Sequence, residues 1–347
     1  MTAVQQAKPT RQWIVSRAFD LLFVANLWWV ALLLLPYSKE TILAQSSGIE
    51  FWQIYFITAP HRWITLLLVA TDPDRREGRG WVFAVIAIVT AVIVVGLRLT
   101  QSQFACLVLI DFLWNAWHFG SQHGGILRIY GRMGGGGHPA LERWAFRTYV
   151  IYVSIRAAAW ATGWTEQYPA AQRGLEWLDW GILLAPASLV ILELIDRPWQ
   201  RLGKLVYLIS AVSMYAVLLY AIRSTDRFLV ITMAVAYAAF HAVEYFAIVT
   251  FYAQRRSKSG SSAGAFRLMA RNWLRVLAVY LIVSGMVLQY LDREWREWYI
   301  GLNLWAAFLH YAYDGMIWKL RRVDTAKALA VDLPKGSAAA SAPAVSS

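Results

Sequence analysis

Cysteine and charged residues are both scarce in this chain of 347 residues. Cys106 is the single cysteine, so an intrachain disulfide is excluded. Charged residues make up only 16% of the chain and hydrophobic residues 59%, and the mean hydropathy is +0.43. A soluble domain is much less apolar than this. The composition therefore predicts an integral membrane protein.

Acidic residues are also few. The chain has 21 Asp and Glu but 33 Lys and Arg, so its formal net charge is +12. Such an excess of positive charge can indicate nucleic-acid binding. Here, however, the basic residues gather in short connections between apolar runs, as the positive-inside rule predicts. These connections are 72–79, 128–143, 196–204, 255–271 and 319–322. We therefore expect no nucleic-acid partner, and a multi-pass protein of the cell (inner) membrane with both termini in the cytoplasm.

Ten apolar runs approach the ~20 residues that an α-helix needs to cross a bilayer. They cover residues 14–36, 51–71, 81–99, 103–129, 145–163, 178–195, 204–223, 227–252, 273–291 and 297–320. The first run is too long for a cleaved signal sequence, so we expect it to remain as an anchor. The sequence predicts an all-α, polytopic membrane helix bundle of about ten transmembrane helices. It forms a single domain, residues 1–330, in contact with membrane lipids, and residues 331–347 are a disordered tail.

Five of the six histidines lie inside predicted spans, and four of them share one depth. His61, His118, His241 and His310 precede charged residues at one end of their helices by about nine to fourteen positions. At ~1.5 Å per residue, this places all four imidazoles roughly 15–20 Å from the same membrane face, near the middle of the bilayer. The four helices are even-numbered in the series, so they run in the same direction. A compact bundle would bring the four rings into one layer.

Two of these histidines have an acidic residue about one helical turn further on. Asp314 follows His310 by four positions, and Glu244 follows His241 by three, so each carboxylate shares the face of its histidine. Metal sites in helix bundles use this spacing. We predict that the four histidines bind a metal ion and that Glu244 and Asp314 act as catalytic groups, further ligands or orienting groups.

His123 is a fifth candidate metal ligand, in the stretch WNAWHFGSQHGG at 114–125. Five residues of α-helix turn it well away from His118, so both can bind one ion only if the helix is distorted, for which Gly120 offers an opportunity. A lone histidine in a membrane helix is more often a hydrogen-bonding group than a ligand. Four histidines at one depth beside buried carboxylates favour a metal site, because a buried carboxylate needs a counter-charge that a metal ion can supply.

Short patches around the histidines resemble a known family. The sequences APH at 59–61, WHFG at 117–120, FH at 240–241 and HYAYD at 310–314 are similar, in order, to the four histidine patches of the Brp/Blh-type beta-carotene 15,15'-dioxygenases. The resemblance implies a polytopic membrane protein whose four histidines bind a non-haem iron used to split beta-carotene into retinal. The chain departs from the family pattern at Thr65, where the family has an acidic residue. It also departs near Glu244 and Tyr245, where the family has a second histidine.

Several functions are compatible with such a site. The leading hypothesis is a non-haem iron oxygenase for a lipid-soluble substrate such as a carotenoid, since histidines with carboxylates suit iron and dioxygen chemistry. Zinc in the same site would instead indicate a lipid hydrolase. Facing histidine pairs can also ligate a b-type haem, and a polar layer without metal is typical of a transporter or scaffold. No flavin, iron–sulfur or dinucleotide pattern appears, so the sequence identifies no electron donor.

Overall fold

The structure is a computed structural model of the chain. It describes residues 11–34, 51–76, 78–101, 104–196, 198–258, 268–269, 271–290, 293–320, 325–326 and 329. The predicted tail at 331–347 and the extreme N-terminus lie outside the described residues.

The described residues form a bundle of long helices and contain no strand. Nine of the ten apolar runs coincide with one helix each, because a long apolar run can satisfy its backbone polar groups within hydrocarbon only by forming a helix. These helices are α4 (Phe51–Thr71), α6 (Gly80–Gln101), α7 (Ala105–Gly134), α8 (Pro139–Ala161), α10 (Pro169–Ile195), α11 (Leu202–Arg223), α12 (Arg227–Lys258), α14 (Trp273–Tyr290) and α15 (Arg293–Ile317). Short elements between them are α5 (Pro73–Arg76), α9 (Trp164–Gln167) and η2 (Pro198–Gln200).

The first apolar run does not form the single helix predicted for 14–36. Its described part contains α1 (Arg17–Phe19), the π-helical turn η1 (Asp20–Val24) and α2 (Trp29–Leu32). The Asp20 carboxylate accepts hydrogen bonds from the backbone N–H of Ile14 and Val15, and Asn26 breaks the helix with a φ of 48°. The prediction was wrong here because polar residues inside an apolar run can bind the local backbone and interrupt a helix.

Four helices of the described chain are long and apolar enough to cross a membrane: Gly80–Thr100, Pro169–Ile195, Leu202–Arg223 and Arg227–Arg256. Large apolar side chains on the outer helices are exposed, among them Ile88 on α6, Leu184 on α10 and Ile282 on α14. An exposed apolar surface of this kind is expected where a protein faces lipid. The structure thus indicates a membrane protein, whereas the count of about ten spans and the cytoplasmic termini stay predictions.

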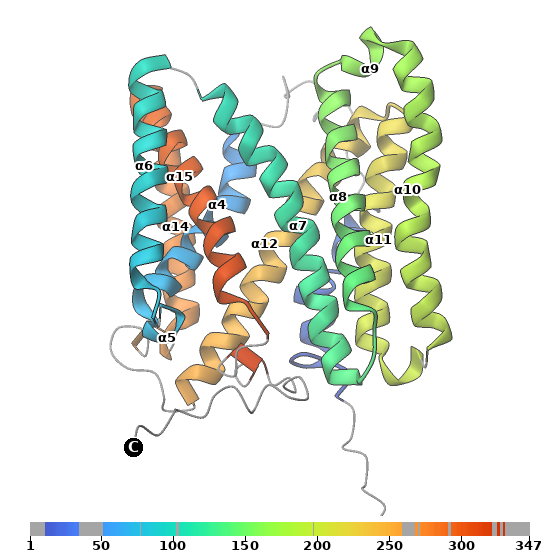
Figure 1. The fold of residues 1–347 in the computed structure, drawn as a ribbon, viewed down its shortest axis with the longest axis horizontal. Helices are drawn as coiled ribbons and strands as arrows, with labels where there is room; N and C mark the ends of the chain where they lie inside the picture. The colour runs from blue at the N-terminus through green and yellow to red at the C-terminus, as the bar shows by residue number, and fades with distance from the viewer. Residues whose placement is uncertain are drawn as a thin grey trace, which may run out of the picture.

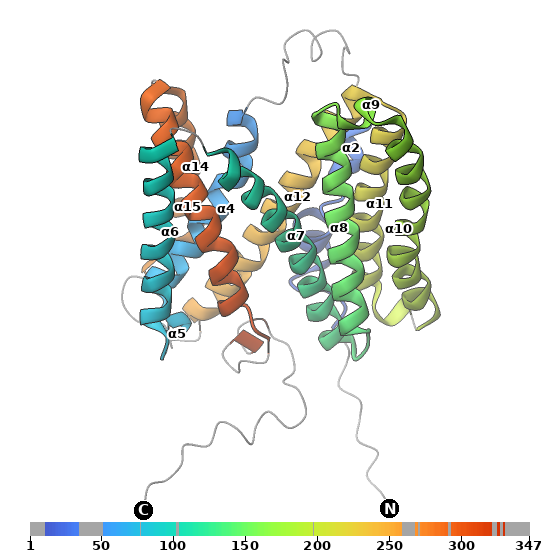
Figure 2. The same ribbon diagram turned by 45° about the horizontal axis from the view of Figure 1, so that its top comes forward.

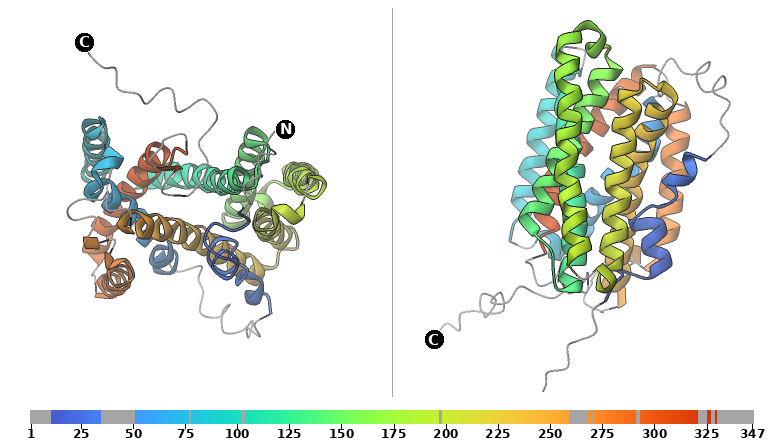
Figure 3. Two further views of the ribbon diagram at one scale, coloured as in Figure 1. Left: turned by 90° about the horizontal axis from the view of Figure 1, so that it is seen from below. Right: turned by 90° about the vertical axis from the view of Figure 1, so that its right-hand side faces the viewer.

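Two groups of helices are joined through α7 and α12, as Figures 1 and 2 show. The first group contains α4, α6, α14 and α15, and the second contains α8, α10 and α11, while α7 and α12 cross the middle of the molecule (Figure 3). The helices α4, α7, α12 and α15 run in the same direction (Figure 1), as the alternation of spans predicts. α15 packs against α4 and α7, and α12 packs against α4. This junction brings the four predicted histidine helices together.

Gly120 and Gly124 bring α7 close to α8. A Cβ atom at Gly120 would lie 2.7 Å from the Cα atom of Arg147, and one at Gly124 would lie 3.1 Å from the Cα atom of Arg143. Small residues allow such close approach between helices in membrane proteins. α7 continues as an α-helix through Gly120, so this glycine serves close packing and does not distort the helix.

We expect Gly120→Ala to lower the free energy of unfolding by about 1–3 kcal/mol, the usual cost of overpacking. The added methyl group would collide with the backbone of α8. Gly125→Ala is the matched control on the same helix, because its Cβ would meet no atom within 4 Å. Thermal unfolding of both variants in one detergent measures the difference. Equal melting temperatures would contradict the proposed close contact.

Candidate metal centre

Four histidines meet where α4, α7, α12 and α15 come together. Each helix contributes one of them, namely His61, His118, His241 and His310. Three of the side chains are fully buried, and His118 is 8% exposed. The four histidines that the sequence predicted at one depth therefore form a single cluster in the core of the helix bundle.

The four imidazole rings form a closed quadrilateral. Ring centroids lie 4.8 Å apart for both His61–His241 and His61–His310, 5.1 Å for His118–His241 and 4.6 Å for His118–His310. Neighbouring rings are steeply inclined, at 81° in three contacts and 69° in the fourth. The Nε2 atoms of His241 and His61 are 3.2 Å apart, and those of His310 and His118 are 3.0 Å apart. The rings thus face one another in two pairs through their Nε2 atoms.

These separations suit the ligands of a metal ion. Nitrogen atoms about 2.1 Å from one ion and about 90° apart are about 3.0 Å from each other, which agrees with both Nε2 pairs. Ligand atoms of His61, His241 and His310 lie within 4.8 Å of one another, and so do those of His118, His310 and Asp314. Imidazoles with one adjacent carboxylate are donors that zinc and non-haem iron prefer.

Asp314 is anchored through one carboxylate oxygen and faces the histidines with the other. Its Oδ1 accepts hydrogen bonds from the hydroxyl of Tyr245 (2.9 Å) and from the indole N–H of Trp318 (3.2 Å). Its Oδ2 lies 3.9 Å from Nε2 of His118 and 3.8 Å from Nδ1 of His310. Asp314 therefore has one oxygen directed at two of the four rings.

Thr65 fixes the orientation of His310. Its Oγ1 donates to Oδ1 of Asp314 (3.2 Å) and lies 2.6 Å from Nδ1 of His310. Oγ1 also contacts the hydroxyl of Tyr245. When the Thr65 proton is given to Asp314, Oγ1 accepts the Nδ1 proton of His310, and this tautomer leaves the lone pair on Nε2. A hydrogen bond on the distal ring nitrogen is the usual way in which metal-binding histidines are oriented. Sequence reasoning noted Thr65 only as a departure from the family pattern.

His123 and Glu244 belong to a neighbouring polar cluster. Nδ1 of His123 lies 2.7 Å from the hydroxyl of Tyr207 and 3.4 Å from Oε2 of Glu244, and its Nε2 lies 3.2 Å from the hydroxyl of Tyr215. Glu244 also accepts hydrogen bonds from Tyr207 and Gln122. The structure does not bring these two predicted site residues into the four-histidine centre. Since α7 stays helical, the five-residue offset turns His123 away from His118.

Arg62 is a buried residue beside the centre that sequence reasoning overlooked. It directly follows His61 on α4, donates to the hydroxyl of Tyr311 (3.2 Å) and lies 3.6 Å from Oδ2 of Asp111. The Tyr311 hydroxyl lies 2.9 Å from Oδ1 of Asp111 and 3.0 Å from Oδ1 of Asn115. These polar residues of α7 thus find partners within the bundle. A charged residue inside a predicted span was the signal available in the sequence.

A cavity of about 620 Å³ leads to the centre between α7, α8, α12 and α15. His118 and Asp314 line it together with the aromatic side chains of Trp114, Trp117 and Tyr311. Its volume falls in the range of small-molecule sites, ~300–1,000 Å³. The arrangement therefore offers a substrate access to one histidine and to the carboxylate.

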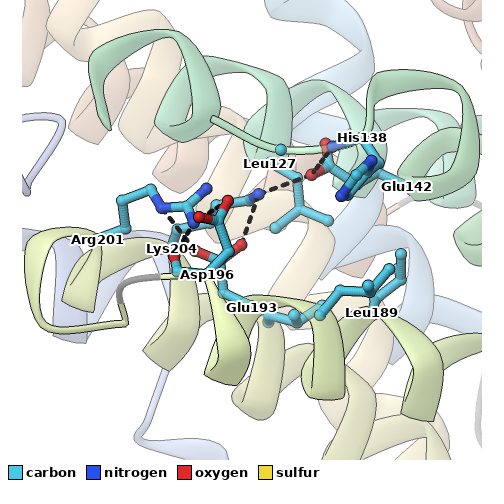
Figure 4. A pocket seen from close by; sticks show the side chains of 11 residues that line it. Leu127, His138, Glu142, Leu189, Glu193, Asp196, Arg201 and Lys204 are labelled. Atoms are coloured by element: carbon cyan, nitrogen blue, oxygen red, sulfur yellow. Dashed lines mark hydrogen bonds and ion pairs between the residues drawn. The ribbon is translucent and has the colours of Figure 1, made fainter. Parts of the chain in front are cut away.

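A separate ion network lies at the loop between α7 and α8 (Figure 4). Lys204 Nζ contacts Glu142 (2.7 Å) and Glu193 (2.8 Å), and Arg201 contacts Glu193 (3.2 Å) and Asp196 (2.7 Å). The remaining space is only about 10 Å³. These charges form ion pairs that tie the loop to α10 and α11, which indicates a structural role. Among the histidines, His138 alone lines this small space.

Comparisons of the chain with protein families, with curated proteins and with solved structures find no match.

Proposed function

We propose that the four-histidine centre binds non-haem iron and that the protein is a membrane oxidoreductase of the oxygenase type. Its substrate is a lipid-soluble molecule such as a carotenoid. The observation that carries this proposal is the closed ring of imidazoles beside Asp314, with Nε2 separations of 3.0 and 3.2 Å, at the end of a substrate-sized cavity. The resemblance of the histidine patches to the Brp/Blh-type dioxygenases supports the same assignment.

In this function the chain's own residues bind the metal, orient its ligands and limit access of water. Bound non-haem iron would supply dioxygen chemistry toward a double bond or a C–H bond. Thr65 holds His310 with its Nε2 lone pair toward the centre. Asp314 places a carboxylate oxygen beside His118 and His310, where it can balance charge or hold a proton. Trp114 and Trp117 give the cavity an apolar wall that orients a lipid-soluble substrate.

A zinc-dependent lipid hydrolase is the second candidate function. The Oδ2 atom of Asp314, which faces two imidazoles, would suit a general base that activates water in such an enzyme. A haem between the histidine pairs is less compatible with this geometry, because Nε2 atoms 3.0–3.2 Å apart leave no room for a macrocycle.

Elemental analysis of the detergent-purified full chain, together with oxygen uptake in the presence of a carotenoid, tests the proposal. We expect about one iron per chain and carotenoid-dependent oxygen consumption. Stoichiometric zinc without iron would replace the oxygenase proposal with the hydrolase. An intense Soret band would indicate haem, and absence of bound metal would favour a transporter or scaffold.

A further inference from the structure

The cavity that reaches His118 is lined by aromatic and cationic side chains together with Asp314. Arg147 lies against Trp117 near His118, whereas Arg128 and Arg132 lie further along α7. The cationic residues are Arg128, Arg132, Arg143, Arg147 and Lys319, and Asp314 is the one acidic residue among those that line the cavity. A single passage thus joins the candidate metal centre to a cluster of positive charge.

One face of α7 connects these two parts. His118, Ser121, Gly125, Arg128 and Arg132 all line the cavity, and they follow one another at intervals of three or four residues, which is the spacing of one helix face. At ~1.5 Å per residue, Arg128 lies ~15 Å and Arg132 ~21 Å from His118 along the helix. This separation matches an extended lipid chain rather than a compact polar molecule.

Between His118 and Arg128 the wall of α7 carries glycine and isoleucine residues beside Ser121 and Gln122. Added Cβ atoms at Gly125 and Gly315 would meet nothing within 4 Å, so these glycines leave open space beside the wall. Ile129 and Ile248 line the same cavity. An aliphatic chain would therefore find an apolar path between the arginines and the imidazoles.

Arg128 is half-buried and Arg143 is exposed, and both differ in their partners from the fully buried cations of the protein. Arg156 is paired with Asp179 at 2.9 Å and Lys204 with Glu142 at 2.7 Å. Within the part of the chain that the structure describes, Arg128 and Arg143 form no ion pair. Like charges that line one cavity repel each other, and a carboxylate or phosphate bound between guanidinium groups removes that repulsion through charge-assisted hydrogen bonds.

Arg147 is already held in place at the wall. Its Nε donates to Oγ of Ser121 (2.9 Å), and its guanidinium lies 4.1 Å from the ring centroid of Trp117. A positive-inside bias alone would place arginines at this end of the bundle. The positive-inside bias does not explain why these arginines line a cavity that extends to His118.

We infer that the substrate of the proposed centre, a carotenoid or another lipid-soluble molecule, carries an anionic head, a carboxylate or a phosphate, on its long apolar chain. Arg128 and Arg143 hold the head, beside Arg132, whose guanidinium also donates to the carbonyl oxygen of Leu320 (2.8 Å). The chain follows the α7 face past Gly125, and the bond to be oxidised lies beside His118. This substrate class rests on the proposed function for its chemistry, but the binding itself does not require the metal.

Equilibrium binding of tritiated palmitate to the full chain in an uncharged detergent tests the inference, with and without bound metal. We expect palmitate to bind at least about 10-fold more tightly than methyl palmitate, since a charge-assisted hydrogen bond contributes about that factor or more. Arg128→Gln combined with Arg143→Gln should weaken palmitate binding by a similar factor. Arg76→Gln is the control, because Arg76 is exposed on α5 and does not line the cavity. Competition by phosphatidic acid distinguishes a lipid phosphate head from a free carboxylate.

Gly125→Leu provides an independent variant that leaves every arginine and histidine in place. Its side chain would fill the middle of the passage, so we expect loss of palmitate binding while inorganic phosphate still binds the arginines. Equal binding of palmitate and its methyl ester, or no effect of the double arginine variant, would overturn the inference. Binding of inorganic phosphate with no preference for the long chain would also overturn it. Palmitate binding by a protein that holds no iron would leave the inference intact and remove the proposed function.

Discussion

We expect His241→Ala to lower the affinity for the bound metal by about 100-fold or more, since loss of even an outer-shell partner of a metal site typically costs 10–100-fold. His241 contacts both His61 and His118 in the ring of imidazoles, and its Nε2 lies 3.2 Å from that of His61. Alanine removes one of the four imidazoles and leaves the other three with an open side. Elemental analysis of the purified variant beside the wild type measures the loss.

His123→Ala is the matched comparison for this experiment. Both histidines are fully buried, but the ring nitrogens of His123 face Tyr207 and Tyr215. We therefore expect His123→Ala to retain the metal although it loses buried hydrogen bonds. Size-exclusion chromatography and circular dichroism establish that both variants are folded. If His241→Ala kept its full metal content while folded, the four-histidine centre would not be the metal site.

The second large effect is expected from Asp314→Asn. The amide keeps the shape of the side chain and can still accept hydrogen bonds from Tyr245 and Trp318 through its oxygen. It removes the negative charge that faces His118 and His310. We expect kcat to fall by about 100-fold or more, the usual contribution of a positioned acid or base. The metal content should fall much less than in His241→Ala.

Glu244→Gln tests which of the two carboxylates predicted from the sequence, Glu244 or Asp314, contributes more to catalysis. Glu244 contacts Tyr207, Gln122 and His123 and is not among the residues grouped around the imidazole ring. We therefore expect a smaller loss of kcat than for Asp314→Asn. Steady-state oxygen uptake with saturating substrate compares the two variants. A larger loss in Glu244→Gln would assign the catalytic carboxylate to the neighbouring cluster.

Helix positions could be predicted from the sequence because they depend on local properties of the chain. An apolar run of about 20 residues has few stable alternatives to a helix in a membrane, and nine runs coincide with helices from α4 to α15. The first run shows the limit of this reasoning. Asp20 and Asn26 bind nearby backbone groups and end the helix locally, an effect that average hydropathy does not reveal.

The depth of His61, His118, His241 and His310 was also determined by the sequence, since the rise per residue of an α-helix is fixed. Which side chains meet at that depth was decided only by the tertiary structure. Helix rotation and crossing angle depend on packing, such as the close approach of Gly120 to α8. Packing turned His123 toward two tyrosines and brought Thr65 to His310 from a helix 245 positions away. No spacing along one helix can predict such contacts, because they join side chains whose relative orientation only the assembled bundle fixes.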